Sequence, residues 1–286
     1  MGDFLNRLRF YQYLLTDDMK KKARSDYNKF QDLMSTLAPH VGTIKGRTVL
    51  DVGCGRRYPL SLLLGSFGNT VTGIDIVYVG LGDSVLERYI KGWRCNGVES
   101  LMRSLAYDLL LKDRAYYRAL ETLCDFPLTT GNIKITQMGA ESMVLPDEGF
   151  DIAVSNAVFE HIADVPKAVA ELARVVRRGG YVHIFIHLFS ALSGGHHPDY
   201  LSPAKVPPWD HLRERKHVVP SYLNGLREGE YIALFRDKFD IIELVDVGKG
   251  EGRDLLTPEI RAELADYFEE ELLKRGITIV AQRRRL

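Results

Sequence analysis

The stretch from Thr48 to Leu64, TVLDVGCGRRYPLSLLL, constrains this chain more than any other. It places a short apolar run, with Val49, Leu50 and Val52, before two closely spaced glycines and an apolar helical pattern that begins near Pro59. Such apolar runs are typical of strands, glycine permits positive φ and close backbone approach, and proline is favoured in the first helical turn. The sequence therefore predicts a strand, a tight turn that binds a ligand, and a helix.

A second strand is predicted about twenty residues later. It is VTGIDI at 71–76, and Asp75 near its end is placed to accept both hydroxyls of a ribose. A dinucleotide turn needs a third glycine in G-x-G-x-x-G, and this chain has Tyr58 there. Asp51 would repel a pyrophosphate but attract the ammonium of a methionine moiety. The residue types favour S-adenosylmethionine over a dinucleotide.

The segments VLDVGCG, GID and FDIAVSNAVFEHI, spread over residues 48–188, resemble the class I S-adenosylmethionine-dependent methyltransferases, type 11 in particular. The resemblance implies an α/β fold with a seven-stranded Rossmann-like sheet, mostly parallel with an antiparallel last strand, and S-adenosyl-L-methionine as the cofactor. Carried over to this chain, the cofactor-binding residues are Asp51, Gly53, Cys54, Gly55, Asp75, Ile76, Ala140, Glu141 and Asn156.

The chain departs from this family pattern at two positions. Arg57 stands where the family often has a third small residue, and Gly139 stands where many relatives have an aspartate. The usual carboxylate that accepts the adenine amino group is thus missing, and Glu141 is expected to substitute for it. An ordinary exposed loop acid is the alternative interpretation of Glu141.

Composition narrows the function further. The 38 basic and 38 acidic residues cancel, so no overall field attracts nucleic acid or anionic lipid, and we expect neither as a partner. The three cysteines include no CxxC pair, which suits a reducing, cytoplasmic location and predicts no metal site. No run of about 18 apolar residues is present, so no integral membrane span is expected.

The chain is expected to form a single domain over residues 1–286. Helices are predicted within residues 1–40, at 3–15 and from Asp17 or Asp18 to Leu37, before Pro39. Residues 84–124 predict a helical insertion of two or three helices outside the sheet, on its carboxyl side. Its aromatic residues suit an acceptor pocket, a homodimer surface or a small core of its own.

The remaining elements follow from periodicity and boundary residues. Asp164 as the N-cap, Pro166, and the arginines before Gly179 bound one helix especially clearly. Strands are predicted at 133–136, 151–155, 181–188, 239–247 and 277–283, and helices at 164–178, 228–238 and 256–275. Between them, residues 190–224 are rich in Gly, Pro and His with little periodicity, which predicts an acceptor-side loop.

The histidines of this loop are the candidate catalytic groups. If the acceptor is a hydroxyl, a base must take its proton, and histidine titrates near neutral pH. We predict that the 193–208 segment closes over the cofactor about a Gly194-Gly195 hinge, with His196 or His197 as the general base and Asp199 orienting it. His161, just beyond the strand predicted at 151–155, is expected to pack at a helix start or to form a hydrogen bond; it and His187 are the next candidates for the base.

The sequence favours O-methylation of a small-molecule or glycosyl acceptor. N-methylation and a non-catalytic nucleoside-binding protein are the alternatives, the latter suggested by Arg57 and Gly139. A metal-dependent hydrolase or lyase is a further alternative, although adjacent histidines make a poor chelate. Its ligands would be His196, His197, Asp199 and His211.

Overall fold

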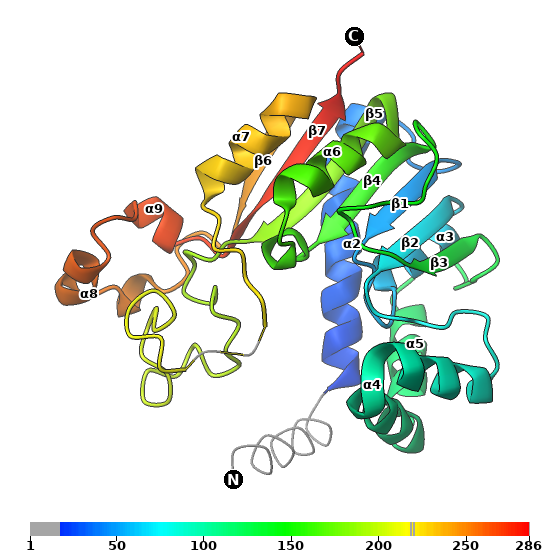
Figure 1. Cartoon of the computed structure of the whole chain (residues 1–286), viewed down its shortest axis with the longest axis horizontal. Coiled ribbons are helices and arrows are strands. Elements are labelled where there is room, and N and C mark those ends of the chain that lie inside the picture. The colour runs from blue at the N-terminus through cyan, green and yellow to red at the C-terminus, as the bar shows by residue number, and fades with distance from the viewer. Residues whose placement is uncertain (1–17, 218, 220, 286) are drawn as a thin grey trace. The chain divides into compact units, whose positions relative to one another are not determined.

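The structure is a computed structural model that describes residues 18–217, 219 and 221–285. The strands in this part of the chain form one seven-stranded sheet in the order β3-β2-β1-β4-β5-β7-β6 (Figure 1). The pairs β2/β3, β1/β4 and β4/β5 are parallel, and β7 is antiparallel to both β5 and β6. This confirms the predicted α/β class, with a mostly parallel sheet and an antiparallel last strand.

The bounds of the strands lie within two residues of the predicted ones, except that β5 begins five residues before the predicted 181. They are β1 (Thr48–Val52), β2 (Thr70–Asp75), β3 (Ile133–Gln137), β4 (Phe150–Asn156), β5 (Val176–His187), β6 (Phe239–Val247) and β7 (Gly276–Arg283).

The helices of the described residues are α2 (Met19–Val41), α3 (Pro59–Ser66), α4 (Val85–Leu109), α5 (Lys112–Glu121), η1 (Phe159–His161), α6 (Val165–Val175), α7 (Glu228–Lys238), η2 (Arg253–Leu255), α8 (Pro258–Glu263) and α9 (Glu269–Leu272). The predicted helix at 3–15 lies outside the described residues. None of the helices described is long and apolar enough to cross a membrane.

The chain divides into two compact units, and the first holds the residues up to Gly46 together with Cys54–Gln137. Helix α2 begins where predicted, since the Asp18 carboxylate accepts from the backbone N–H groups of Lys20 and Lys21, but it continues past Pro39 to Val41. It packs on α3 and α5. Tyr116 of α5 is fully buried and donates to Asp26 at 2.8 Å.

The insertion contributes no strand, as predicted. Helix α4 breaks at Gly97, and α5 follows it, which agrees with the two or three helices expected. Tyr107 is the one buried residue of α4, whereas Trp93 and Met102 are each 53% exposed. The alternative of a small core within the insertion therefore does not describe α4.

The second unit holds Arg47–Gly53 together with Met138–Leu286. Helix α6 is capped by Asp164 as predicted, and α7 packs beside α6 and against β6. The prediction of a helix to residue 178 was wrong: β5 begins at Val176, which pairs with Phe150. Arg177 lies in this strand, and its Nε donates to Asp151 at 2.6 Å.

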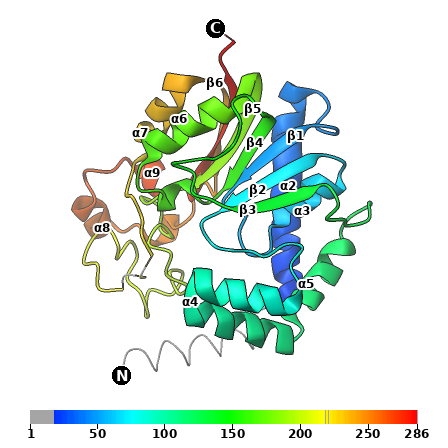
Figure 2. The same ribbon diagram turned by 45° about the vertical axis from the view of Figure 1, so that its right-hand side comes forward.

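The segment 190–224 contains no helix or strand among its described residues, as predicted. It is held by a buried apolar cluster around Trp209, which is 1% exposed and donates from Nε1 to the carbonyl of Ser190 at 3.2 Å. Figures 1 and 2 both show this segment beside α8 and α9. We call the buried apolar cluster around Trp209 the Trp209 cluster. Its buried members are Leu192, Trp209, Ile260, Leu264, Leu272 and Leu273.

The single helix predicted at 256–275 was wrong. The structure has the two short helices α8 and α9 instead, with a turn at 264–267 between them. Leu264 in this turn is buried in the Trp209 cluster, and Tyr267 packs against it. Packing against a distant segment thus overrides the local helical pattern.

Candidate functional site

The glycine turn after β1 is anchored, within the first unit, to the end of β2. Gly55 has φ +71°, and a side chain on it would meet nothing within 4 Å. Its N–H donates to Asp75 Oδ2 at 2.8 Å, while Asp75 Oδ1 accepts from the N–H of Val77 at 2.8 Å. Cys54 is buried and its N–H donates to the carbonyl of Ile74. The structure thus brings together the predicted residues Cys54, Gly55 and Asp75; Ile76, next to Asp75, is 73% exposed.

Close packing against Val158, as well as its positive φ, requires a glycine at position 53. Within the second unit, Gly53 has φ +73°, and a Cβ on it would lie 2.3 Å from a methyl carbon of Val158. In the β1/β4 register, Val52 pairs with Ser155, whose hydroxyl donates to the Val52 carbonyl. Asn156, the last residue of β4, therefore lies at the same sheet edge as Gly53. Asp51 in β1 is buried, at 2% exposure.

Arg57, the departure from the family pattern, is explained by the insertion. Its side chain is 10% exposed and its Nε donates to Asp113 of α5 at 2.7 Å. The guanidinium also lies over the rings of Tyr107 and Tyr116, at 4.8 and 5.2 Å from their centroids. Arg56 pairs with the same carboxylate. The two arginines thus fasten the turn to α4 and α5.

Tyr58, at the third glycine position, adopts positive φ (+39°) just before α3. The turn therefore keeps the left-handed backbone that a glycine normally supplies, while carrying an aromatic side chain. Desolvation raises the pKa of the Tyr58 phenol above its ordinary value.

The predicted adenine-side residues lie in the second unit. Ala140 is buried, at 8% exposure. Glu141 is half-buried, and its Oε1 accepts from the N–H of Asp164, just before α6, at 3.3 Å. A positively polarised helix start favours a carboxylate nearby. This contact gives Glu141 a structural role, and its adenine contact stays a prediction.

Three histidines meet in the second unit. The His196 ring stacks on His187, with centroids 4.6 Å apart and planes at 22°, and meets His161 edge-on at 5.0 Å. His187 Nε2 lies 2.8 Å from Ser193 Oγ, and His161 Nδ1 lies 2.8 Å from the carbonyl of Tyr222. The expectation that His161 makes a hydrogen bond is therefore confirmed. We call Glu160, His161, His187 and His196 the histidine cluster.

Burial dominates the electrostatics of this cluster. Desolvation lowers the pKa of His187 to about 3 and that of His196 to about 4, and the neighbouring histidines and, for His187, Arg275 add to the effect. Desolvation also raises the pKa of Glu160 to about 8; the nearby N–H groups of Glu160 and His187 oppose this only in part. Both histidines are thus neutral at pH 7.

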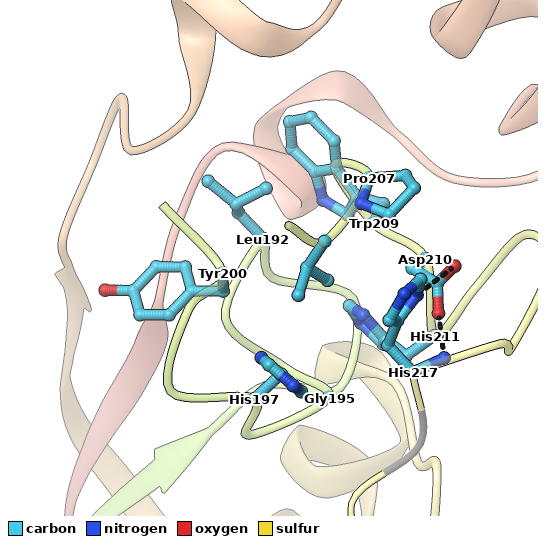
Figure 3. Close-up of a pocket in the computed structure, with 10 residues that line it drawn as sticks. Leu192, Gly195, His197, Tyr200, Pro207, Trp209, Asp210, His211 and His217 are labelled. Atoms are coloured by element: carbon cyan, nitrogen blue, oxygen red, sulfur yellow. Dashed lines mark hydrogen bonds and ion pairs between the residues drawn. The ribbon is translucent and has the colours of Figure 1, made fainter. Parts of the chain in front are cut away.

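The other two predicted catalytic residues have different surroundings. His197 Nδ1 accepts from the backbone N–H of Asp199 at 3.1 Å, and the Asp199 carboxylate pairs with Lys205 at 2.9 Å. His197 lines a small cavity with Tyr200, Trp209 and His217, shown in Figure 3. This cavity has room for about one water molecule.

Close packing explains why residues 194 and 195 are glycines. A Cβ on Gly194 would lie 2.2 Å from the carbonyl oxygen of Phe189, and one on Gly195 would lie 2.8 Å from His211. Neither glycine has positive φ, whereas His196 does (+57°). The predicted hinge therefore coincides with a tightly packed segment.

The sequence missed Glu160 and gave His187 only a reserve role. Among the described residues, Glu160, His187 and His196 form a group whose ligand atoms all lie within 4.8 Å of one another, and no such group combines His196, His197, Asp199 and His211. His211 instead lies 2.7 Å, through Nε2, from the Phe189 carbonyl. An acid inside the apolar run FEHI was the one sequence signal for Glu160.

Comparisons with known proteins find similarity to methyltransferases. A family model described as "Methyltransferase domain" matches residues 79–184. The chain is 51% identical over 144 residues to a tRNA U34 carboxymethyltransferase of Alteromonas mediterranea, covering 50% of this chain and 33% of that protein. It is 30% identical over 173 residues to a malonyl-[acyl-carrier protein] O-methyltransferase of Serratia marcescens, covering 60% and 57%.

Among solved structures, the geranyl diphosphate C-methyltransferase of Streptomyces coelicolor A3(2), in complex with Mg²⁺, geranyl diphosphate and S-adenosyl-L-homocysteine, matches with a TM-score of 0.50 and 16% identity. The match covers 92% of this chain and 83% of that one, and it supports the fold. The chain spans between a third and three fifths of the length of the two curated relatives named above.

Proposed function

The chain belongs to the class I S-adenosylmethionine-dependent methyltransferases, and we propose that it transfers the methyl group of S-adenosyl-L-methionine to a hydroxyl of a small molecule or glycan. The observation that carries the proposal is the bond from the Gly55 N–H to the Asp75 carboxylate. It places the carboxylate beside a turn whose glycine faces open space. A bound ribose would meet that carboxylate, and the open turn leaves room for the rest of the cofactor.

The reaction needs mainly positioning. A sulfonium gives up its methyl group by in-line displacement, and the leaving thioether is neutral, so an aligned acceptor oxygen supplies most of the rate. The acceptor hydroxyl must lose its proton as it attacks. His196 or His197, with Asp199, remain the predicted agents. Of the two, His196 would be the weaker base, because desolvation lowers its pKa to about 4 and its Nε2 is buried.

The names of the relatives define the rival acceptors. One relative is named for a tRNA and the other for a malonyl group on acyl carrier protein. The equal numbers of acidic and basic residues favour an uncharged small acceptor over tRNA, because tRNA binding relies on excess positive charge. The finer assignment to a hydroxyl of a small molecule or glycan is therefore the one we test.

The test uses methyl-labelled cofactor and three acceptor pools: hydroxylated small molecules and oligosaccharides, bulk tRNA, and malonyl-acyl carrier protein. We expect label in the first pool that survives mild alkali, because ethers resist hydrolysis and methyl esters do not. Nuclease-sensitive label would assign tRNA, and alkali-labile label would assign a carboxyl group. Binding of S-adenosyl-L-homocysteine, measured beforehand, separates a wrong acceptor from an inactive protein.

A further inference from the structure

We propose that Glu160, His187 and His196 form a binding site for a divalent transition-metal ion of the zinc, cobalt, iron(II) or manganese type. The three residues come from η1, the last position of β5 and the segment after β5, all in the second unit. Their ligand atoms lie within 4.8 Å of one another, close enough for small side-chain movements to bring them to one ion. This inference concerns metal binding and needs no methyl transfer for its test, but it shares His196 with the proposed function.

The strongest observation is an unsatisfied buried acid. Glu160 is 2% exposed, and neither of its carboxylate oxygens has a hydrogen-bond partner among the described residues. A buried carboxylate is costly unless it is protonated or paired with a cation. Among the described residues, Glu160 forms no ion pair with a lysine or arginine. A proton or a bound cation can then offset the burial, and the ligand atoms of His187 and His196 within 4.8 Å favour the cation.

A second, independent observation is the nitrogen beside it. His196 Nε2 is also buried without a hydrogen-bond partner in the described part of the chain. The planes of the His187 and His196 rings lie at 22° to each other. For both rings to coordinate one ion, one of them would have to rotate about its side-chain bonds.

The neighbourhood also supplies support around the ligands. Ser193 Oγ lies 2.8 Å from His187 Nε2 and holds that ring in orientation. Backbone positions fix the other two: His196 N–H donates to the Ser193 carbonyl, and Asn224 N–H donates to the Glu160 carbonyl. The bond between Ser193 and the His187 ring is of the kind that orients metal ligands, while the two backbone bonds fix the positions of the other two residues.

The donor set indicates which metal. Two imidazoles and one carboxylate are the ligands of many zinc enzymes and of open iron(II) sites, whereas calcium and magnesium prefer oxygen ligands alone. Three protein ligands leave further coordination positions open. A water or hydroxyl group bound at such a position would have its pKa lowered by the ion. His196 would then act as a ligand instead of a proton acceptor, so the two roles need separate tests.

The experiment titrates the chain, after treatment with a chelator, with Co²⁺ and follows visible d–d absorption. We expect one Co²⁺ per chain, competed by Zn²⁺. The variants Glu160→Gln and His196→Ala should each weaken binding by about tenfold or more. His197→Ala is the matched control, because it removes the adjacent histidine outside the set, and it should bind Co²⁺ like the parent chain.

Two readouts guard the result. Far-ultraviolet circular dichroism and thermal denaturation establish that each variant is folded, and Glu160→Gln preserves the size of the side chain. A near-ultraviolet charge-transfer band would mean that Co²⁺ binds thiolates of Cys54, Cys95 or Cys124, and this would overturn the proposal. So would the absence of stoichiometric binding, or binding that Glu160→Gln and His196→Ala leave unchanged.

Discussion

The glycine turn after β1 and the segment 190–224 after β5 are both connections that leave the carboxyl end of a strand, yet different forces fix their conformations. In the turn, three residues with positive φ, Gly53, Gly55 and Tyr58, and the Gly55–Asp75 bond determine the backbone locally. In the segment, the Trp209 cluster does so through residues more than fifty positions away. Local rules thus predict the turn in detail, whereas the segment could be predicted only as irregular.

The largest effect should come from the Trp209 cluster. Trp209→Ala removes a buried indole and should lower the free energy of unfolding by about 3–5 kcal/mol. Trp209→Phe is the control, because it keeps most of the apolar volume and loses mainly the bond to the Ser190 carbonyl. Thermal and denaturant unfolding measure both. Equal, small losses would mean that the cluster does not hold the segment.

Gly53→Ala should have the next largest effect. The new Cβ would meet Val158 at 2.3 Å, and alanine disfavours the positive φ, so stability should fall by roughly 2–4 kcal/mol. Gly55→Ala meets no neighbour and should cost about 1–2 kcal/mol from φ alone, while still weakening cofactor binding. Unfolding curves compare the two variants. If Gly55→Ala proves the more destabilising, packing against Val158 is not what selects Gly53.

Features of the fold that depend on neighbouring residues could be predicted from the sequence, and those that depend on distant residues could not. Asp18, Asp164 and the glycine turn follow chemical rules that act over a few residues, so their positions were predicted. The break of the 256–275 helix could not be, because it depends on Leu264 packing in the Trp209 cluster.

The candidate site also has one part that neighbouring residues determine and one part that distant residues determine. That Gly55 and Asp75 lie near each other follows from two neighbouring strand ends, although the bond between them was not predicted. The meeting of Glu160, His187 and His196 requires the path of the segment after β5. The sequence carries no short-range signal of that path.

Asp75→Ala tests the turn through its ligand. Losing hydrogen bonds to a charged group should weaken S-adenosyl-L-homocysteine binding by roughly 1.5–3 kcal/mol. Asp75→Asn, which keeps one acceptor oxygen, should lose less. Calorimetry gives both affinities, and an unchanged affinity in Asp75→Ala would place the ribose elsewhere.

A smaller, pH-dependent effect is expected from His183 in β5. Desolvation lowers its pKa to about 4, so it stays neutral in the folded chain while the unfolded chain takes up a proton below about pH 6.5. The folded pKa is the lower one, so stability is present above about pH 6.5 and falls as the pH drops toward 4. His183→Gln should remove roughly 3 kcal/mol of this loss between pH 7 and 4, measured by denaturant unfolding. A pH profile parallel to that of the parent chain would assign the acid sensitivity to other groups.

The most direct test of the account is calorimetric titration of the purified chain with S-adenosyl-L-homocysteine and, separately, with NADH. The glycine turn, with Asp75 bound to Gly55 and Tyr58 in place of a third glycine, predicts saturable binding of S-adenosyl-L-homocysteine and none of NADH. Binding of NADH together with no heat from S-adenosyl-L-homocysteine would contradict it.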